Sequence, residues 1–200
     1  PASDLDSLQG YYVQVASTAV EDTSNNAYAG ISDTTTLSFT AADVAAPTLA
    51  SSSPADDATG VAVNSNIVLT FNETVQAGTG NITLFKSDNT SVEVFDVTTD
   101  VTVSGATVTL NPASDLDSLQ GYYVQVASTA VEDTSNNAYA GISDTTTVSF
   151  TAADSEMPSV IVSGPSVTVS GSFDAIATFS ENVTGLLENE ITVLFDKKTL

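Results

Sequence analysis

One stretch of this sequence occurs twice almost without change. Residues 112–154 repeat residues 1–43 with a single difference, Leu37 in the first copy and Val148 in the second. Because the copies begin at residues 1 and 112, the period is 111 residues. Self-similarity at a fixed period indicates tandem structural units, each a separate supersecondary or domain-sized module. One complete unit therefore spans residues 44–154, and residues 1–43 form the C-terminal half of a preceding unit.

Residues 155–200 are not a copy of the segment that begins the complete unit. They share with it the spacing Phe-x-Glu-x-Val, which occurs at Phe71–Val75 and again at Phe179–Val183. We therefore expect residues 155–200 to form the N-terminal half of a second type of domain. On this interpretation the sequence is a window on a longer tandem array.

The charge of the chain is strongly one-sided. It carries 25 Asp and Glu residues against 3 Lys and Arg residues, a net charge of −22. Phosphate backbones would be repelled, which excludes nucleic acid as a natural partner. An anionic membrane surface is disfavoured for the same reason, so no direct membrane contact is expected. Without cysteine, core packing and bound cations are the available stabilisers.

Short runs rich in Val, Ile and Thr, separated by turn residues, predict an all-β fold. The complete unit is expected to be an Ig-like or fibronectin III-like, seven-strand antiparallel sandwich within a linear array. The expected strands are 48–53, 66–71, 80–86, 91–97, 106–110, 121–128 and 145–151. Alternation breaks inside 91–97, which indicates a bulge. The predicted core comprises Leu69, Phe71, Leu84, Val108, Leu110, Tyr122, Val124 and Phe150.

A leucine, Leu116, lies six residues before a tyrosine, Tyr122, that opens a strand. This spacing resembles the tyrosine corner of Ig-like sandwiches. More specifically, the unit resembles the bacterial Ig-like domains of S-layer proteins and large repetitive adhesins. The matching segments are 53–56, 60–63, 67–73, 122–126 and 132–138, with Asn136 where family members commonly have glycine. Residues 179–185 and 190–193 are similar to repeats of biofilm-associated surface proteins.

Catalytic chemistry is poorly supplied. The chain has no histidine and no cysteine, so the usual general base and the thiol nucleophile are missing. Pairs of carboxylates could serve a glycosidase, but small tandem sandwiches rarely form the cleft that such an enzyme needs. We therefore expect no enzyme activity.

Calcium prefers carboxylate and carbonyl oxygens, and the loops of a sandwich gather such residues at its two poles. Stacking units head to tail would bring the acidic end of one unit against the acidic start of the next. The first junction would collect Asp4, Asp6, Asp43, Glu73, Glu132 and Asp133. The second would collect Asp56, Asp57, Asp115, Asp117, Asp154 and Glu181. We favour calcium at or near these junctions; the alternative is a solvated acidic surface suited to saline water.

The resemblance implies a structural, non-catalytic stalk or filament segment of a large extracellular bacterial protein, at the cell surface or secreted. Its partners would be neighbouring Ig-like repeats, and cell-surface or matrix glycans through domains outside this sequence. The alternative is a carbohydrate-binding or spacer module of a secreted polysaccharide-degrading enzyme. Four tyrosines could then stack on sugars, although side chains that fill or cover a sheet are the more common case. They are Tyr12, Tyr28, Tyr123 and Tyr139.

Overall fold

The computed structural model describes residues 4–166 and 170–185, and every regular element in them is a β-strand. No described part of the chain forms a helix that is long and apolar enough to cross a bilayer. Contacts divide the chain into two units, Pro1–Asp154 and Ser155–Leu200. The first unit contains the repeated segment twice. Residues 186–200, which include residues 190–193 and their resemblance, lie outside the described residues.

Two short antiparallel pairs lie outside the complete repeat. In the first copy, β1 (Gly10–Tyr12) pairs with β2 (Ser38–Thr40). In the second unit, β14 (Val160–Ser163) pairs with β15 (Ile176–Phe179).

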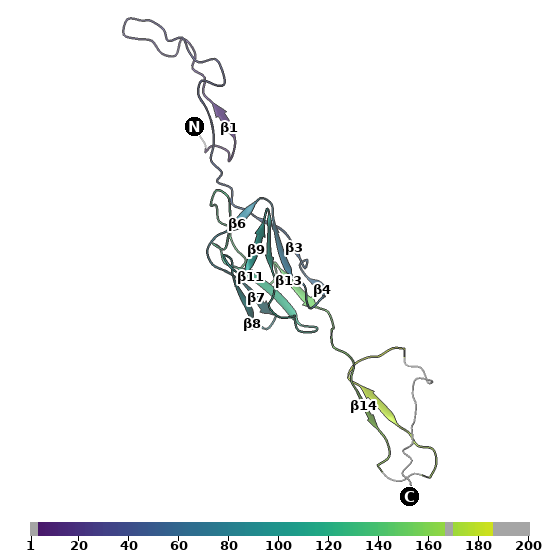
Figure 1. Ribbon diagram of the computed structural model, residues 1–200. Coiled ribbons are helices and arrows are strands. Elements are labelled where there is room, and N and C mark those ends of the chain that lie inside the picture. The colour runs from purple at the N-terminus through teal and green to yellow at the C-terminus, as the bar shows by residue number, and fades with distance from the viewer. Residues whose placement is uncertain (1–3, 167–169, 186–200) are drawn as a thin grey trace. The chain divides into compact units, whose positions relative to one another are not determined.

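Residues 44–154 form a sandwich of two sheets (Figure 1). One sheet has the order β3-β5-β10-β9 and the other has the order β4-β13-β11-β7-β8, while β12 and β6 form a separate ribbon. The strands are β3 (Leu49–Ser53), β4 (Ala58–Val61), β5 (Ile67–Phe71), β6 (Val75–Ala77), β7 (Asn81–Lys86), β8 (Ser91–Asp96), β9 (Val101–Ser104), β10 (Thr107–Leu110), β11 (Gly121–Val126), β12 (Val131–Asp133) and β13 (Ser149–Ala152). The all-β sandwich expected from the sequence is confirmed.

Each of the seven expected strands has a counterpart, and the structure adds β4, β6, β9 and β12. These strands have only three or four residues, too few for alternation to reveal them. β4 lies between the first two expected strands, and it pairs with β13 in parallel, so the sandwich is not purely antiparallel. The first two strands of the unit therefore lie at the edges of different sheets, β3 in one sheet and β4 in the other.

The last expected strand begins later than predicted, at Ser149 and not at residue 145. The side chain of Asp144 explains the difference. Its Oδ1 accepts hydrogen bonds from the backbone N–H groups of Thr146 (2.8 Å) and Thr147 (2.7 Å). A side chain that bonds the backbone locally offers an alternative to the ladder, so these residues form a turn.

The expected bulge is present between β7 and β8. Leu84 pairs with Glu93, but Phe85 pairs with Ser91, so Val92 has no partner in the register. Beyond the bulge, Val94 lies on the same exposed side of β8 as Val92, and Phe95 is buried.

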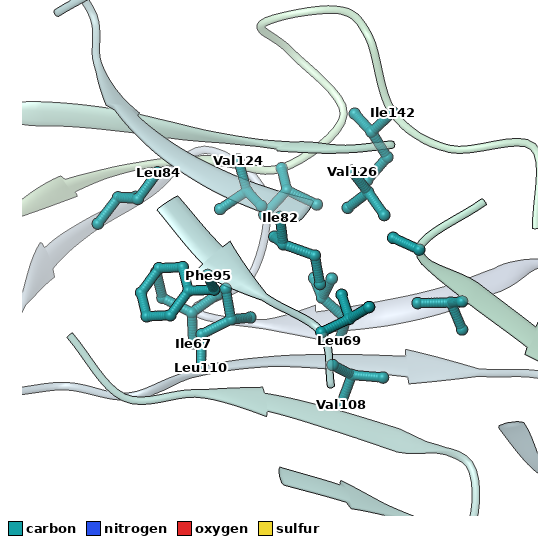
Figure 2. Close-up of a cluster of buried hydrophobic side chains, with 14 of the residues drawn as sticks. Ile67, Leu69, Ile82, Leu84, Phe95, Val108, Leu110, Val124, Val126 and Ile142 are labelled. Atoms are coloured by element: carbon teal, nitrogen blue, oxygen red, sulfur yellow. The ribbon is translucent and has the colours of Figure 1, made fainter. Parts of the chain in front are cut away.

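The core lies between the two sheets, and all eight predicted core residues are buried in one hydrophobic cluster. Figure 2 shows its centre, where Ile67, Leu69, Val108 and Leu110 from one sheet meet side chains of the other sheet such as Ile82 and Val124. Alternate residues of β5 face inward because successive side chains of a strand point to opposite faces.

The tyrosine corner is also confirmed. The Oη of Tyr122 accepts a hydrogen bond from the backbone N–H of Asp117 at 2.7 Å, and its ring stacks on Phe150 with centroids 5.7 Å apart. The first copy forms the same bond, from the N–H of Asp6 to the Oη of Tyr11 at 2.8 Å.

Candidate metal centre

Three carboxylates from separate segments converge at the start of the complete unit. Asp43 lies between β2 and β3, Glu73 lies in the loop between β5 and β6, and Asp133 ends β12. One carboxylate oxygen of each lies within 4.8 Å of the other two. Two oxygens on opposite sides of one Ca²⁺ are about 4.6–5.2 Å apart, so one ion can touch all three carboxylates.

A tight loop holds Asp133 in place. Its Oδ1 accepts hydrogen bonds from the backbone N–H groups of Ser135 and Asn137, both at 2.8 Å. Its Oδ2 accepts one from Nδ2 of Asn137 at 2.7 Å. Asn136 adopts a φ of 66°, which asparagine tolerates better than most residues. The side chain is therefore fixed before any ion binds.

Asp133 is 1% exposed, and its ionisation reflects two opposing effects. Burial alone would raise the pKa of the carboxyl. The hydrogen bonds from the side chain and backbone of Asn137 and from the backbone of Ser135 outweigh burial and lower the pKa. Asp133 is therefore charged at neutral pH, as a metal ligand must be.

Asp43 connects the first copy to the cluster. Its Oδ1 accepts hydrogen bonds from the Oγ of Ser7 at 2.7 Å and from the backbone N–H of Ala45 at 3.1 Å. Its backbone carbonyl accepts a hydrogen bond from Nδ2 of Asn137 at 3.2 Å. Asn137 therefore touches both Asp133 and the segment between β2 and β3, the linker between the first copy and the sandwich.

Glu73 is the electrostatically unfavourable member of the cluster. Burial raises the pKa of its carboxyl, and the negative charges of Asp133 and Asp43 raise that pKa further. In a protein without metal, a carboxyl with a raised pKa destabilises the folded state while it is charged. A cation at this point would remove that penalty.

This raised pKa predicts a pH dependence for the metal-free protein. In the unfolded chain the pKa of Glu73 has its ordinary, lower value. As the pH falls from the raised pKa towards that ordinary value, Glu73 takes up a proton in the folded state first and ceases to destabilise it. We expect the stability of the wild type to rise relative to that of Glu73→Gln over this range. Urea unfolding in chelator, measured in steps from pH 7 to pH 4.5, checks the difference. Parallel pH profiles for the two proteins would show that Glu73 has an ordinary pKa.

The other residues proposed from the sequence have different surroundings. Among the described residues, no second trio of carboxylates meets the same geometric condition. Glu132 accepts a hydrogen bond from Nε2 of Gln76 at 3.0 Å. Asp117 forms an ion pair with Lys86 at 2.5 Å. Asp56 and Asp57 both accept hydrogen bonds from Ser149, and Asp154 accepts one from Ser118. Three other candidates, Asp4, Asp6 and Asp115, are exposed. Glu181 belongs to the second unit.

Sequence reasoning did not select Asn137, because Asp and Asn are common in ordinary turns. The signal was its distance from Asp133, four residues, which lets one amide close the loop onto the carboxylate. The same loop recurs in the first copy, where Nδ2 of Asn26 donates to Oδ2 of Asp22 at 2.8 Å.

The tyrosines of the complete unit are not exposed platforms. Tyr139 is buried with its ring edge against Phe71, at a centroid distance of 5.1 Å. Tyr123 is buried against Phe85 and donates its hydroxyl hydrogen to Oδ1 of Asn89 at 2.9 Å. Tyr12 and Tyr28, the equivalents in the first copy, are exposed.

Comparison with known proteins places the fold. Residues 43–152 match the family model described as a bacterial Ig-like domain. No curated protein matches the chain. Among solved structures, the crystal structure of CopC from Methylosinus trichosporium OB3b is 16% identical, with a TM-score of 0.37, over 56% of this chain and 97% of that one.

Proposed function

Because the chain belongs to the family of bacterial Ig-like domains, a non-catalytic type of structural module, we propose that it is a stalk or filament segment of a large extracellular bacterial surface protein. The adhesin and S-layer proteins that the sequence resembles are the proposed class. In this role each sandwich is a rigid element, and the linkers between units determine how far the array bends.

We propose further that calcium stiffens the linker between successive units. The observation that carries this proposal is the convergence of Asp43, Glu73 and Asp133. Asp43 belongs to the linker, whereas the other two belong to loops of the sandwich, so a shared ion would fasten the linker to the sandwich. The remaining ligands of the roughly 6–8 that calcium takes would be water and backbone carbonyls.

Two of these carboxylates have sequence equivalents further along the chain. Asp154 is the equivalent of Asp43 and accepts a hydrogen bond from the Oγ of Ser118 at 3.0 Å, as Asp43 does from Ser7. In sequence, Glu181 holds the position of Glu73 in the Phe-x-Glu-x-Val spacing. Asp154 belongs to the first unit of the chain and Glu181 to the second.

Calcium should raise the melting temperature of the 200-residue chain, because a ligand that binds only the folded state stabilises it. The gain is about 2.7 kcal/mol at a concentration 100 times the dissociation constant. Thermal unfolding in millimolar calcium and in chelator, at equal ionic strength set with sodium chloride, checks this. If sodium alone reproduces the shift, screening explains it and the calcium proposal fails.

Three variants sharpen the test. Asp133→Asn should abolish most of the calcium shift, whereas Asp22→Asn should leave it intact. Asp22 accepts the same three hydrogen bonds within its own loop but is not part of the trio. Glu73→Gln should raise the melting temperature in chelator, by removing repulsion, and should reduce the gain in calcium, by removing a ligand. A variant that lost stability equally in both conditions would indicate a purely structural role.

A further inference from the structure

A polar groove lies on the outer face of the five-stranded sheet. It encloses about 560 Å³ and runs across β4, β13 and β11, which are neighbours in the sheet (Figure 1), to the turn between β7 and β8. Tyr122 and Phe150 belong to the core between the sheets. Their neighbours Tyr123, Ser149 and Thr151 therefore point to the opposite, outer face and line the groove. The volume lies in the range of about 300–1,000 Å³ that is usual for small-ligand pockets.

The chemistry of the lining restricts the ligand. Most of the side chains carry a hydroxyl group, and Asp57 is the one charged residue among the described residues that line the groove. An anion would be repelled by this carboxylate and by the net charge of −22. An apolar ligand would displace water from the hydroxyl groups without replacing its hydrogen bonds, which costs free energy. A neutral ligand rich in hydroxyl groups avoids both penalties.

Asn89 is held in place at one side of the groove. The Oη of Tyr123 donates a hydrogen bond to its Oδ1 at 2.9 Å. Tyr123 is itself 5% exposed, and it stacks on Phe85 with ring centroids 5.1 Å apart. Because this bond engages the amide oxygen, the two hydrogens of Nδ2 can be donated to a ligand. Tyr123 thus positions Asn89 and is not a stacking platform.

Asp57 lies at the other side of the groove, directly before β4. Its Oδ1 accepts a hydrogen bond from the Oγ of Ser149 at 3.1 Å, which holds the carboxylate against β13. A carboxylate has about four lone-pair sites on its two oxygens, so it can also accept hydrogen bonds from a ligand. Because β13 and β11 lie between Asp57 and Asn89, a ligand that bonds to both residues must span two strands. This favours an oligosaccharide over a single sugar.

We propose that this groove is a binding site for a neutral oligosaccharide. Asp57 accepts hydrogen bonds from its hydroxyl groups, and Asn89, positioned by Tyr123, donates to its oxygen atoms. The half-buried hydroxyl groups of Ser149 and Thr151 supply further hydrogen bonds along the floor. No described residue of the groove belongs to the carboxylate trio at the start of the unit. The oligosaccharide site and the calcium site are therefore separate proposals, and neither depends on the other.

Nuclear magnetic resonance of the isotope-labelled 200-residue chain tests the proposal. The chain is titrated, to millimolar concentration, with each of three neutral hexasaccharides: cellohexaose, laminarihexaose and mannohexaose. We expect at least one of them to shift the backbone amide signals of Thr59, Ser149 and Thr151 in a saturable manner. Hexagalacturonate, an anion of similar length, should leave these signals unchanged.

Two variants and a matched control locate the contacts. Asp57→Asn and Asn89→Gly should each raise the dissociation constant at least about tenfold, because each removes hydrogen bonds to the ligand. Glycine tolerates the φ of 69° at position 89. Asp88→Asn makes the same change of charge as Asp57→Asn but should leave binding unchanged, because Asp88 does not line the groove. Its Oδ1 accepts a hydrogen bond from the backbone N–H of Thr90 at 2.9 Å, which an asparagine oxygen can also accept.

Tyr123→Phe tests the positioning of Asn89. This change removes the hydroxyl group that fixes the amide but keeps the ring. It should weaken binding in the wild-type background and should have little further effect when Asn89→Gly is already present, because the two residues act through one interaction. The amide spectrum of each variant establishes that the sandwich is still folded.

The proposal fails if none of the three neutral hexasaccharides gives saturable shifts at the groove, or if hexagalacturonate gives the same shifts. Equal weakening of binding by Asp57→Asn and Asp88→Asn would also overturn it. So would a loss of binding from Tyr123→Phe that is the same with and without Asn89→Gly.

Discussion

Replacing Tyr122 by alanine should lower the free energy of unfolding of the complete unit by about 3–5 kcal/mol, the usual cost of deleting a large buried aromatic side chain. The ring is 3% exposed and stacks on Phe150. Its loss leaves a cavity, and it also leaves the backbone N–H of Asp117 without its acceptor. Tyr122→Phe keeps the ring and should cost only about 0.5–1.5 kcal/mol, the net contribution of a typical hydrogen bond.

The chain contains its own control for this prediction. Tyr11→Ala removes the same side chain from the same sequence and the same hydrogen bond. Because Tyr11 is not part of the hydrophobic cluster of the complete unit, its loss should change the unfolding of that unit by about 0.5 kcal/mol or less. Urea unfolding followed by circular dichroism and by hydrogen exchange in β7 measures both variants. Equal effects of Tyr11→Ala and Tyr122→Ala would contradict the assignment of the core.

Replacing Gly141 by alanine should have an effect of similar size for a different reason. Gly141 has a φ of +83°, and an added Cβ would lie 2.5 Å from the backbone oxygen of Val126 and 2.9 Å from the backbone nitrogen of Ser128. The chain passes this close because Val126 and Ile142 exchange backbone hydrogen bonds of 2.9 Å in both directions. Backbone strain of about 1–3 kcal/mol and overpacking of about 1–3 kcal/mol should both contribute to the loss of stability.

Two other glycines separate these contributions. Gly105 has a φ of +57° with no atom within 4 Å of an added Cβ, so Gly105→Ala should show strain alone. A Cβ at Gly78, where φ is not in the left-handed region, would lie 2.3 Å from the backbone oxygen of Thr129, so Gly78→Ala should show the clash alone. Unfolding midpoints of the three variants in urea give the comparison. Should Gly141→Ala cost no more than Gly105→Ala, the loop moves away from Val126 easily and its contact there is weak.

The sequence alone determined the period of the repeat and the all-β class of the complete unit. A period of 111 residues is a property of the chain itself and needs no folding to be read. The strands with strong alternation, such as β5 and β7, were also predictable, because a buried face imposes apolar side chains at every second residue. The bulge in β8 and the tyrosine corner could also be predicted, because each is a local pattern of fewer than ten residues.

Only the tertiary structure decided which acidic residues meet. The sequence contains 25 Asp and Glu residues. Assigning their loops to one or the other pole of the sandwich left twelve candidate ligands across two junctions. The trio of Asp43, Glu73 and Asp133 is brought together from positions 30 to 90 residues apart by loops whose paths depend on the short strands β6 and β12. Each of those strands has only three residues, too few to show an alternating sequence pattern, and each forms by pairing with the other. The different surroundings of Val13 and Val124 make the same point, because one local sequence is exposed or buried according to whether a distant segment covers it.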